Sequence, residues 1–176
     1  MILYGPPAAG KLTVARVLAD RYGPALLDNH IAVDAALRLF DFGTEPFADL
    51  CEQIRVSMLR AAARAGGDVV STFMYGYPDD DPAMEALIDA SESGGARVTL
   101  VQRAPSDAAL RTRAVGEDRR ASNKVSDLEL LDSLLTRHDL RTPFHGTDLS
   151  LDNTDTTPEQ VAARIAELVG WQLRAD

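Results

Sequence analysis

The sequence predicts an α/β domain in which helices cover both faces of a parallel sheet. Five short apolar runs, at residues 1–4, 25–27, 69–73, 98–101 and 149–151, have the composition of buried strands. Segments with the apolar period of amphipathic helices separate these runs. Strands that alternate with helices form parallel sheets, and ligands bind beyond the carboxyl ends of such strands. Residues that directly follow each strand are therefore the first candidates for function.

A loop bounded by two glycines joins the first strand to the first helix. It consists of Gly5, Pro6, Pro7, Ala8, Ala9, Gly10, Lys11, Leu12 and Thr13. Strand, glycine-bounded loop and helix form the setting of a phosphate-binding loop, because glycine backbones let successive N–H groups turn toward a phosphate. The positive end of the helix and the Lys11 amine add charge of the required sign. The competing interpretation is an ordinary Gly/Pro turn before a helix that happens to start with lysine.

The order of residues after Lys11 departs from the usual pattern. A hydroxyl that binds magnesium normally follows the lysine directly, whereas here Leu12 intervenes and Thr13 carries the hydroxyl. In this respect the loop resembles the adenylate-kinase-like branch of kinases with a phosphate-binding loop. The resemblance implies a magnesium ion held mainly by phosphates and water.

Helical segments follow the strands in order. The first covers residues 12–22, a second apolar pattern covers 31–40, and a long helix covers 46–65 and ends at Gly66-Gly67. Asp81 before Pro82 predicts a helix N-cap, so the acidic run 79–81 is interpreted as a helix start in preference to a metal site. Further helices are expected from Ser106, from the capping box at 126–129 to about residue 140, and from the cap at Thr157.

Polar residues follow two of the predicted strands. Asp28-Asn29-His30 follows the second strand, and Asp152-Asn153-Thr154 follows the fifth. An imidazole can accept a proton near neutral pH, so His30 is either a base that activates an acceptor hydroxyl or a residue that caps the loop. After the third strand, Tyr75 and Tyr77 either line an acceptor pocket or pack as ordinary loop residues.

A polar and basic stretch interrupts the chain between residues 114 and 124. It contains Arg119, Arg120 and Lys124 and almost no apolar side chain. We interpret segment 113–126 as a lid whose arginines close over transferring phosphates, against the alternative of a solvated connector.

Composition limits the class of protein. A chain of 176 residues, nearly half of them apolar, fits one domain, here 1–176. A net charge of −9 disfavours general nucleic-acid binding, which depends on many basic contacts. The one cysteine, Cys51, is expected in the core, and no apolar stretch approaches the length of a membrane span. We therefore expect a cytoplasmic protein without a membrane partner.

Taken together, the chain resembles small P-loop kinases of the shikimate kinase, gluconate kinase and chloramphenicol phosphotransferase type. The resemblance rests on residues 5–13, 28–30, 110–124 and 152–154. It implies a three-layer α/β/α fold whose five strands have the order 2-3-1-4-5, with ATP and Mg²⁺ as cofactors. It also implies an ATP-dependent transfer of phosphate to a small hydroxyl-bearing molecule or nucleotide.

The same resemblance assigns roles to particular residues. Lys11, Asp28, His30 and Arg119 would be catalytic; Arg113, Asn153 and Thr154 would hold the nucleotide together with the loop; Thr13 and Asp28 would serve the metal. Shikimate kinases carry a second acid where His30 stands, so the acceptor need not be shikimate. Asp68 begins its strand, so the usual magnesium-binding acid at the strand end is missing, and Ser71 and Thr72 are weak substitutes.

Two other functions compete with the kinase. The atypical Leu12 and the missing strand-end acid fit a nucleotide-binding or regulatory module that hydrolyses ATP slowly or not at all. Phosphorylation of an RNA or DNA end is a third hypothesis, which the acidic composition disfavours. The acceptor and the oligomeric state are not encoded in any motif.

Overall fold

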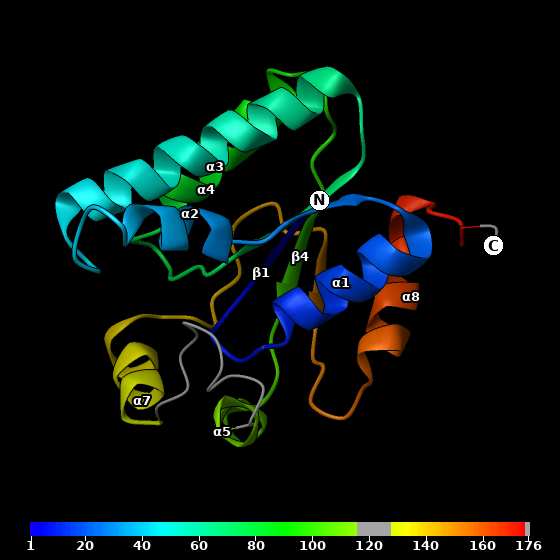
Figure 1. Cartoon of the computed structure of the whole chain (residues 1–176). Coiled ribbons are helices and arrows are strands. Elements are labelled where there is room, and N and C mark those ends of the chain that lie inside the picture. The colour runs from blue at the N-terminus through cyan, green and yellow to red at the C-terminus, as the bar shows by residue number, and fades with distance from the viewer. Residues whose placement is uncertain (116–127, 175–176) are drawn as a thin grey trace.

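The computed structural model describes residues 1–115 and 128–174 (Figure 1). Its centre is a parallel sheet of β1 (Ile2–Tyr4), β2 (Ala25–Leu27), β3 (Val69–Phe73), β4 (Leu100–Arg103) and β5 (Leu149–Leu151). The strands lie in the order β2-β3-β1-β4-β5, and every pair is parallel. This is the predicted three-layer fold and strand order.

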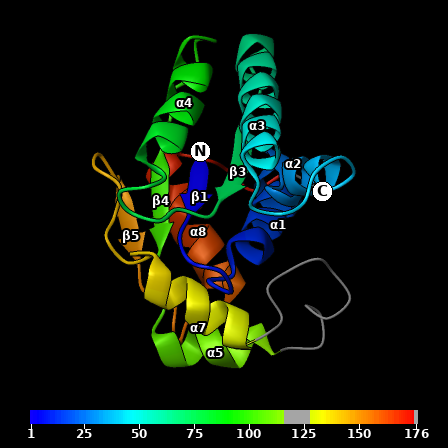
Figure 2. The ribbon, with the colours of Figure 1, turned by 90° about the vertical axis from the view of Figure 1, so that its left-hand side faces the viewer.

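Helices cover both faces of the sheet. Those of the described ranges are α1 (Lys11–Tyr22), α2 (His30–Ala36), α3 (Glu45–Ala65), α4 (Asp81–Glu92), α5 (Asp107–Ala114), α7 (Leu128–Arg137) and α8 (Pro158–Val169). Side chains of α1 and α8 pack with Leu3, Val70 and Val101 on one face. Side chains of α3 and α4 pack on the opposite face around Tyr4, Phe73 and Leu100. The two faces are separated in Figure 1, and α5 and α7 lie together at one end of the molecule in Figure 2.

The fourth strand lies two residues later than the run 98–101 predicted. Ile2 is in register with Leu100, and Tyr4 is in register with Gln102. The strand therefore continues through Gln102 to Arg103, and both side chains are buried. Buried polar side chains at these positions are unusual, because polar residues ordinarily lie at the surface.

The segment between β2 and α3 is less helical than its apolar pattern predicted. Helix α2 ends at Ala36, and residues 37–40 form a turn in which the N–H groups of Leu39 and Phe40 both donate to the Ala36 carbonyl. Leu39 is 70% exposed. The apolar character of residues 37–40 therefore does not reflect a buried helix face.

The buried face of α3 also differs from the predicted one. Phe47 and Cys51 pack against α2, whereas Leu59 reaches the sheet core. Met58, which was predicted on the buried face, is 36% exposed. The long helix contacts two different partners along its length, so no single apolar stripe describes it.

The ends of several helices agree with the sequence to within a few residues. Thr157 forms the predicted capping box with Gln160, and Ser106 accepts the N–H of Ala109. Helix α4 begins at Asp81 with Asp80 as its N-cap, one residue earlier than predicted, and α7 ends at Arg137. Within the described ranges, no helix combines the length and apolar composition needed to cross a bilayer.

Candidate active site at the carboxyl edge of the sheet

The loop after β1 has a backbone that few sequences can adopt. Gly5 has φ +135° and Gly10 has φ +81°, and Gly10 is the N-cap of α1. A Cβ on Gly5 would lie 2.3 Å from the carbonyl oxygen of Arg103, so only glycine fits there. Residues 5–9 are buried and a turn bond joins the Ala9 N–H to the Pro6 carbonyl at 3.3 Å. We call residues 5–13 the phosphate loop.

Ala8 has a left-handed backbone with φ +64°, although it is not glycine. A side chain in this region costs about 1–2 kcal/mol. Non-glycine residues in such conformations cluster at ligand-binding sites, where the surroundings hold the strain. The strain at Ala8 is therefore consistent with a loop shaped for a ligand.

Lys11 is the first residue of α1 and lies back over the phosphate loop. Its Nζ donates to the carbonyl oxygens of Gly5 and Pro6, each at 2.7 Å. These carbonyls hold the ammonium group close to the amides of the loop, and phosphate oxygens are stronger acceptors than carbonyl oxygens. The Lys11 ammonium group thus lies where it can exchange these carbonyl oxygens for the oxygens of a phosphate bound in the loop. In the same turn, Leu12 is half-buried and Thr13 is exposed.

The polar turn after β2 is attached to the end of β3. The Asn29 N–H donates to Thr72 Oγ1 at 3.0 Å, and Asp28 Oδ1 accepts the His30 N–H at 3.1 Å. Asp28 and His30 are both half-buried at the carboxyl edge of the sheet. Thr72 is 4% exposed and fixes this turn. Asp28 therefore keeps one oxygen for the turn and has a second oxygen to offer a ligand.

The predicted metal residues do not make a complete protein site. Within residues 1–115 and 128–174, no group of three His, Cys, Asp or Glu side chains is arranged to hold a metal ion. Asp68 precedes β3 and is exposed at the opposite edge of the sheet. Thr13 and Asp28 supply oxygen atoms of the kind that Mg²⁺ prefers, so these residues fit an ion whose other ligands are phosphate oxygens and water.

The structure brings the predicted nucleotide residues Arg113, Asn153 and Thr154 together beside the phosphate loop. Arg113 Nη2 donates to the carbonyl oxygens of Asn153 at 2.7 Å and Thr154 at 3.1 Å. Asn153 Nδ2 in turn donates to the Ala9 carbonyl at 3.0 Å. Two atoms of this cluster, Arg113 Nη1 and Asn153 Oδ1, are buried and have no hydrogen-bond partner within the described ranges. A donor and an acceptor are thus left for a ligand that carries both kinds of group.

Helices α5 and α7 pack directly against the phosphate loop. Ala8 and Ala9 form one apolar cluster with Leu110, Ala114 and Leu131. Arg113 and Ala114 belong to α5, so the predicted lid segment 113–126 begins within a helix. The remainder of that segment, including Arg119, lies outside the described residues.

The two tyrosines after β3 have different environments. Tyr75 is 1% exposed, packs edge-on against Tyr4 and Phe144, and donates its hydroxyl to Asp81. Burial, followed by the Asp81 hydrogen bond, raises the pKa of Tyr75 well above its usual range. Tyr77 is 44% exposed. Tyr75 is therefore a core residue, and only Tyr77 is open to a ligand.

Two charged residues lie near this edge: Arg55, to which the sequence pattern assigned no role, and Asp80, which was interpreted as part of a helix start. Arg55 of α3 lies over the Phe73 ring, 5.5 Å from its centre, and no residue that the structure describes bonds its buried Nε. Burial lowers the pKa of Arg55, and burial raises the pKa of Asp80, which accepts the Gly76 N–H at 2.8 Å. Arg55 lies one turn after the buried Cys51, and this spacing was the signal available in the sequence.

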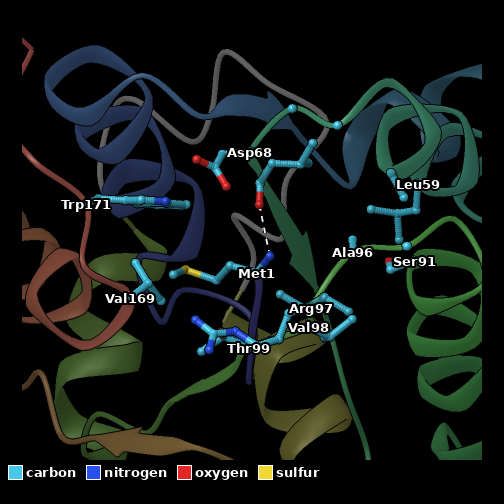
Figure 3. Close-up of a pocket in the computed structure, with 16 residues that line it drawn as sticks. Met1, Leu59, Asp68, Ser91, Ala96, Arg97, Val98, Thr99, Val169 and Trp171 are labelled. Carbon is cyan, nitrogen blue, oxygen red and sulfur yellow. Dashed lines mark hydrogen bonds between the residues drawn. The ribbon is translucent and has the colours of Figure 1, made fainter.

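A hollow of 320 Å³ lies at the other edge of the sheet (Figure 3). Met1, Asp68, Val98 and Thr99, which precede or begin strands, line it together with Trp171. The Met1 amine donates to the Val69 carbonyl there. Because the phosphate loop follows the carboxyl end of β1, this hollow is separate from the candidate active site.

Comparisons of the sequence alone give no relative: no protein-family model and no curated protein matches the chain. Solved structures do match. A sugar kinase from Janibacter sp. HTCC2649 is 16% identical with a TM-score of 0.72, and the match covers 97% of this chain and 93% of that one. A tunicamycin resistance protein from Deinococcus radiodurans is 19% identical with a TM-score of 0.64, over 100% of this chain and 98% of that one.

The shikimate kinase from Acinetobacter baumannii, solved in complex with shikimate, is 20% identical with a TM-score of 0.65. That match covers 96% of this chain and 90% of the kinase. The fold of this chain is therefore that of small P-loop kinases of the shikimate kinase type. At these identities the likeness concerns the fold, and the chemistry must be argued from the residues of this chain.

Proposed function

We propose that this protein is an ATP-dependent phosphotransferase that acts on a small hydroxyl-bearing molecule or a nucleotide. The observation that carries the proposal is the phosphate loop: a buried turn with Gly10 in the left-handed conformation, followed by a helix whose first residue, Lys11, lies over the loop. The fold shared with a sugar kinase and a shikimate kinase supports the same class.

The loop and Lys11 would bind and orient the terminal phosphates. Amides at the start of α1 point their positive dipole ends toward an anion, which lowers the energy of the charge on the phosphate oxygens. Lys11 would leave the carbonyls of Gly5 and Pro6 and remain with the phosphoryl group as charge develops during transfer.

Asp28 and His30 would orient the acceptor. Asp28 is held in place by the His30 N–H, so its second oxygen can accept a hydrogen bond from an acceptor hydroxyl. His30 stands directly beside it and is the alternative proton acceptor. Mg²⁺, when bound beside Thr13 and Asp28, would neutralise charge on the phosphates.

The nucleotide would extend from the phosphate loop toward Arg113, Asn153 and Thr154. The unpartnered Arg113 Nη1 and Asn153 Oδ1 provide one donor and one acceptor on that side. Arg119 in the lid segment would approach the phosphates, as the resemblance implies. Arg55 of α3, which lies over the Phe73 ring, and Asp80, which follows β3, would contact polar groups of the acceptor.

The test is transfer of labelled γ-phosphate from ATP to a panel of sugars, sugar acids, nucleosides and hydroxylated antibiotics. The proposal predicts a labelled product that depends on Mg²⁺ and disappears in Lys11→Ala. Labelled product from Lys11→Ala with any acceptor would contradict it.

A nucleotide-binding module without an acceptor is the second candidate. One observation favours it, namely that Asp68 lies at the start of β3, far from the carboxyl edge where a metal-binding acid would stand. This candidate predicts that MgATP binds but that no acceptor in the panel is labelled. Labelled oligonucleotide ends would instead indicate a polynucleotide-end kinase.

A further inference from the structure

Arg103, the last residue of β4, is a buried cation that forms no ion pair with the carboxylates of residues 1–115 and 128–174. It is 1% exposed and is the largest of the fully buried side chains. Its Nε and Nη1 have no hydrogen-bond partner in the described part of the chain. Buried arginines normally pair with carboxylates or carbonyl oxygens, because an unpaired buried charge destabilises the fold. The isolation of Arg103 therefore requires an explanation.

Arg103 is a neighbour of the phosphate loop along the sheet. Tyr4 is in register with Gln102, so Gly5 and Arg103 follow side by side. The contact is close enough that a Cβ on Gly5 would overlap the Arg103 carbonyl oxygen. The other glycine of the loop, Gly10, has no atom of β4 within 4 Å of the position that a Cβ would take.

The neighbouring charge that acts on Arg103 is a second cation. Burial, followed by the charge of Arg113, lowers the pKa of Arg103 to about 10. Arg113 bonds the Asn153 carbonyl, and the Asn153 side chain bonds the Ala9 carbonyl in the phosphate loop. Arg103 thus adjoins the loop through its main chain and Arg113 adjoins it through Asn153, and each guanidinium has a buried nitrogen without a hydrogen-bond partner among the described residues.

We propose that Arg103 is a positioning residue whose buried positive charge serves the binding of a polyphosphate in the phosphate loop. The inference rests on the nucleotide-binding part of the proposed function. A charge shielded from solvent acts over a longer distance than a surface charge, because salt and water screen it less. In the free protein the unpaired charge of Arg103 destabilises the fold. A polyphosphate bound in the phosphate loop offsets that destabilisation by its negative charge.

This proposal predicts opposite effects on stability and on binding. A neutral residue at position 103 removes the uncompensated charge, so the free protein should become no less stable. The same change should weaken the attraction for triphosphate or pyrophosphate. A residue that only fills space would show the reverse, a loss of stability with binding unchanged.

The experiment compares wild type with Arg103→Met, Arg103→Gln and Arg103→Lys, using calorimetry with MgATP and with pyrophosphate and thermal unfolding without ligand. Arg103→Met and Arg103→Gln should bind both anions about tenfold more weakly, with an unfolding temperature equal to or above that of wild type. Arg103→Lys keeps the charge and should bind within about threefold of wild type.

Arg111→Met is the matched control. Arg111 lies on α5 like Arg113 but is exposed and paired with Asp132 at 3.0 Å. Removal of this screened charge should leave binding within about twofold of wild type.

Two results would overturn the inference. Unchanged binding by a folded neutral variant would show that Arg103 is a packing residue, while wild-type binding of MgATP would leave the proposed function intact. If one neutral variant does not fold, the other and Arg103→Lys still decide the question. Absence of any MgATP binding by wild type would overturn the proposed function together with this inference.

Discussion

The Nζ of Lys11 lies 2.7 Å from the carbonyl oxygen of Gly5, so the first residue of α1 closes back on the first residue of the loop before it. The ammonium group also reaches the Pro6 carbonyl. The two carbonyl oxygens thus hold the positive charge of Lys11 next to the N-terminus of α1, where the positive end of the helix dipole repels it. An anion bound in the loop would offset this repulsion.

Replacement of Lys11 by Met should weaken nucleotide binding while the protein stays folded. Loss of a charged hydrogen bond to phosphate should weaken MgATP binding about 100-fold. The two carbonyl bonds that stabilise the free loop contribute about 1–3 kcal/mol to the free energy of unfolding, so the variant should stay folded. Calorimetry and urea unfolding measure both quantities. Arg16→Met, an exposed change on the same helix, should leave both unchanged.

A side chain at position 5 should disrupt the junction of β1, β4 and the loop. Gly5→Ala places a methyl group 2.3 Å from the Arg103 carbonyl at φ +135°, and we expect a loss of about 3 kcal/mol or more in the free energy of unfolding. Gly66→Ala is the control, since Gly66 also has positive φ but has nothing within 4 Å. Gly66→Ala should lower the free energy of unfolding by about 1–2 kcal/mol. Equal losses in the two variants would show that crowding at Gly5 is not decisive.

Ala8→Gly should destabilise the protein far less than Ala9→Gly, because glycine adopts the left-handed conformation of residue 8 without strain. The relief of about 1–2 kcal/mol offsets the entropy cost of glycine, about 0.5–1 kcal/mol, and the loss of one buried methyl group, about 0.8 kcal/mol. Ala9→Gly, at a fully buried neighbour that lacks positive φ, loses the methyl group without such relief. Denaturant unfolding compares the two variants, and equal destabilisation would contradict the account of strain.

Asp28→Asn should reduce the rate of phosphate transfer without weakening nucleotide binding. Asparagine retains an oxygen that can accept the His30 N–H, so the turn should persist while the negative charge is lost. If Asp28 orients or activates the acceptor, kcat should fall about 100-fold or more and the Kd for MgATP should change little.

His30→Gln distinguishes the two roles proposed for the imidazole. A base would give a fall in kcat of about 100-fold and a changed pH profile of kcat. A residue that only caps or packs the loop would give a modest loss of stability with kcat nearly unchanged. The pH profile of kcat is the deciding measurement, because a structural role would not alter its shape.

The fold was predictable from the sequence because its main signals are local. The runs 25–27, 69–73 and 149–151 are the observed strands, and Thr157 caps α8 as its sequence indicates. The start of β4 at Leu100 was not predictable from the apolar run 98–101, since it is set by pairing with β1, which no local pattern reveals. The turn after Ala36 was missed because its apolar residues, such as Leu39, are exposed.

The candidate site was predictable in part. Residues after the strands meet at one edge by topology, and there Arg113 donates to the Asn153 carbonyl. The side chain of Asn153 bonds the Ala9 carbonyl across 144 residues, and such a contact has no sequence signal. Arg55, Arg103 and the burial of Asp80 became visible only in the structure.

The central claim is that main-chain amides of residues 8–13 bind the phosphates of a nucleotide. The most direct test is an NMR titration of the amide resonances with MgATP. We predict that the largest shifts occur at Ala8, Ala9, Gly10, Lys11, Leu12 and Thr13, and that Lys11→Met abolishes them at the same nucleotide concentration. Shifts confined to other parts of the chain, or none at saturating MgATP, would contradict the account.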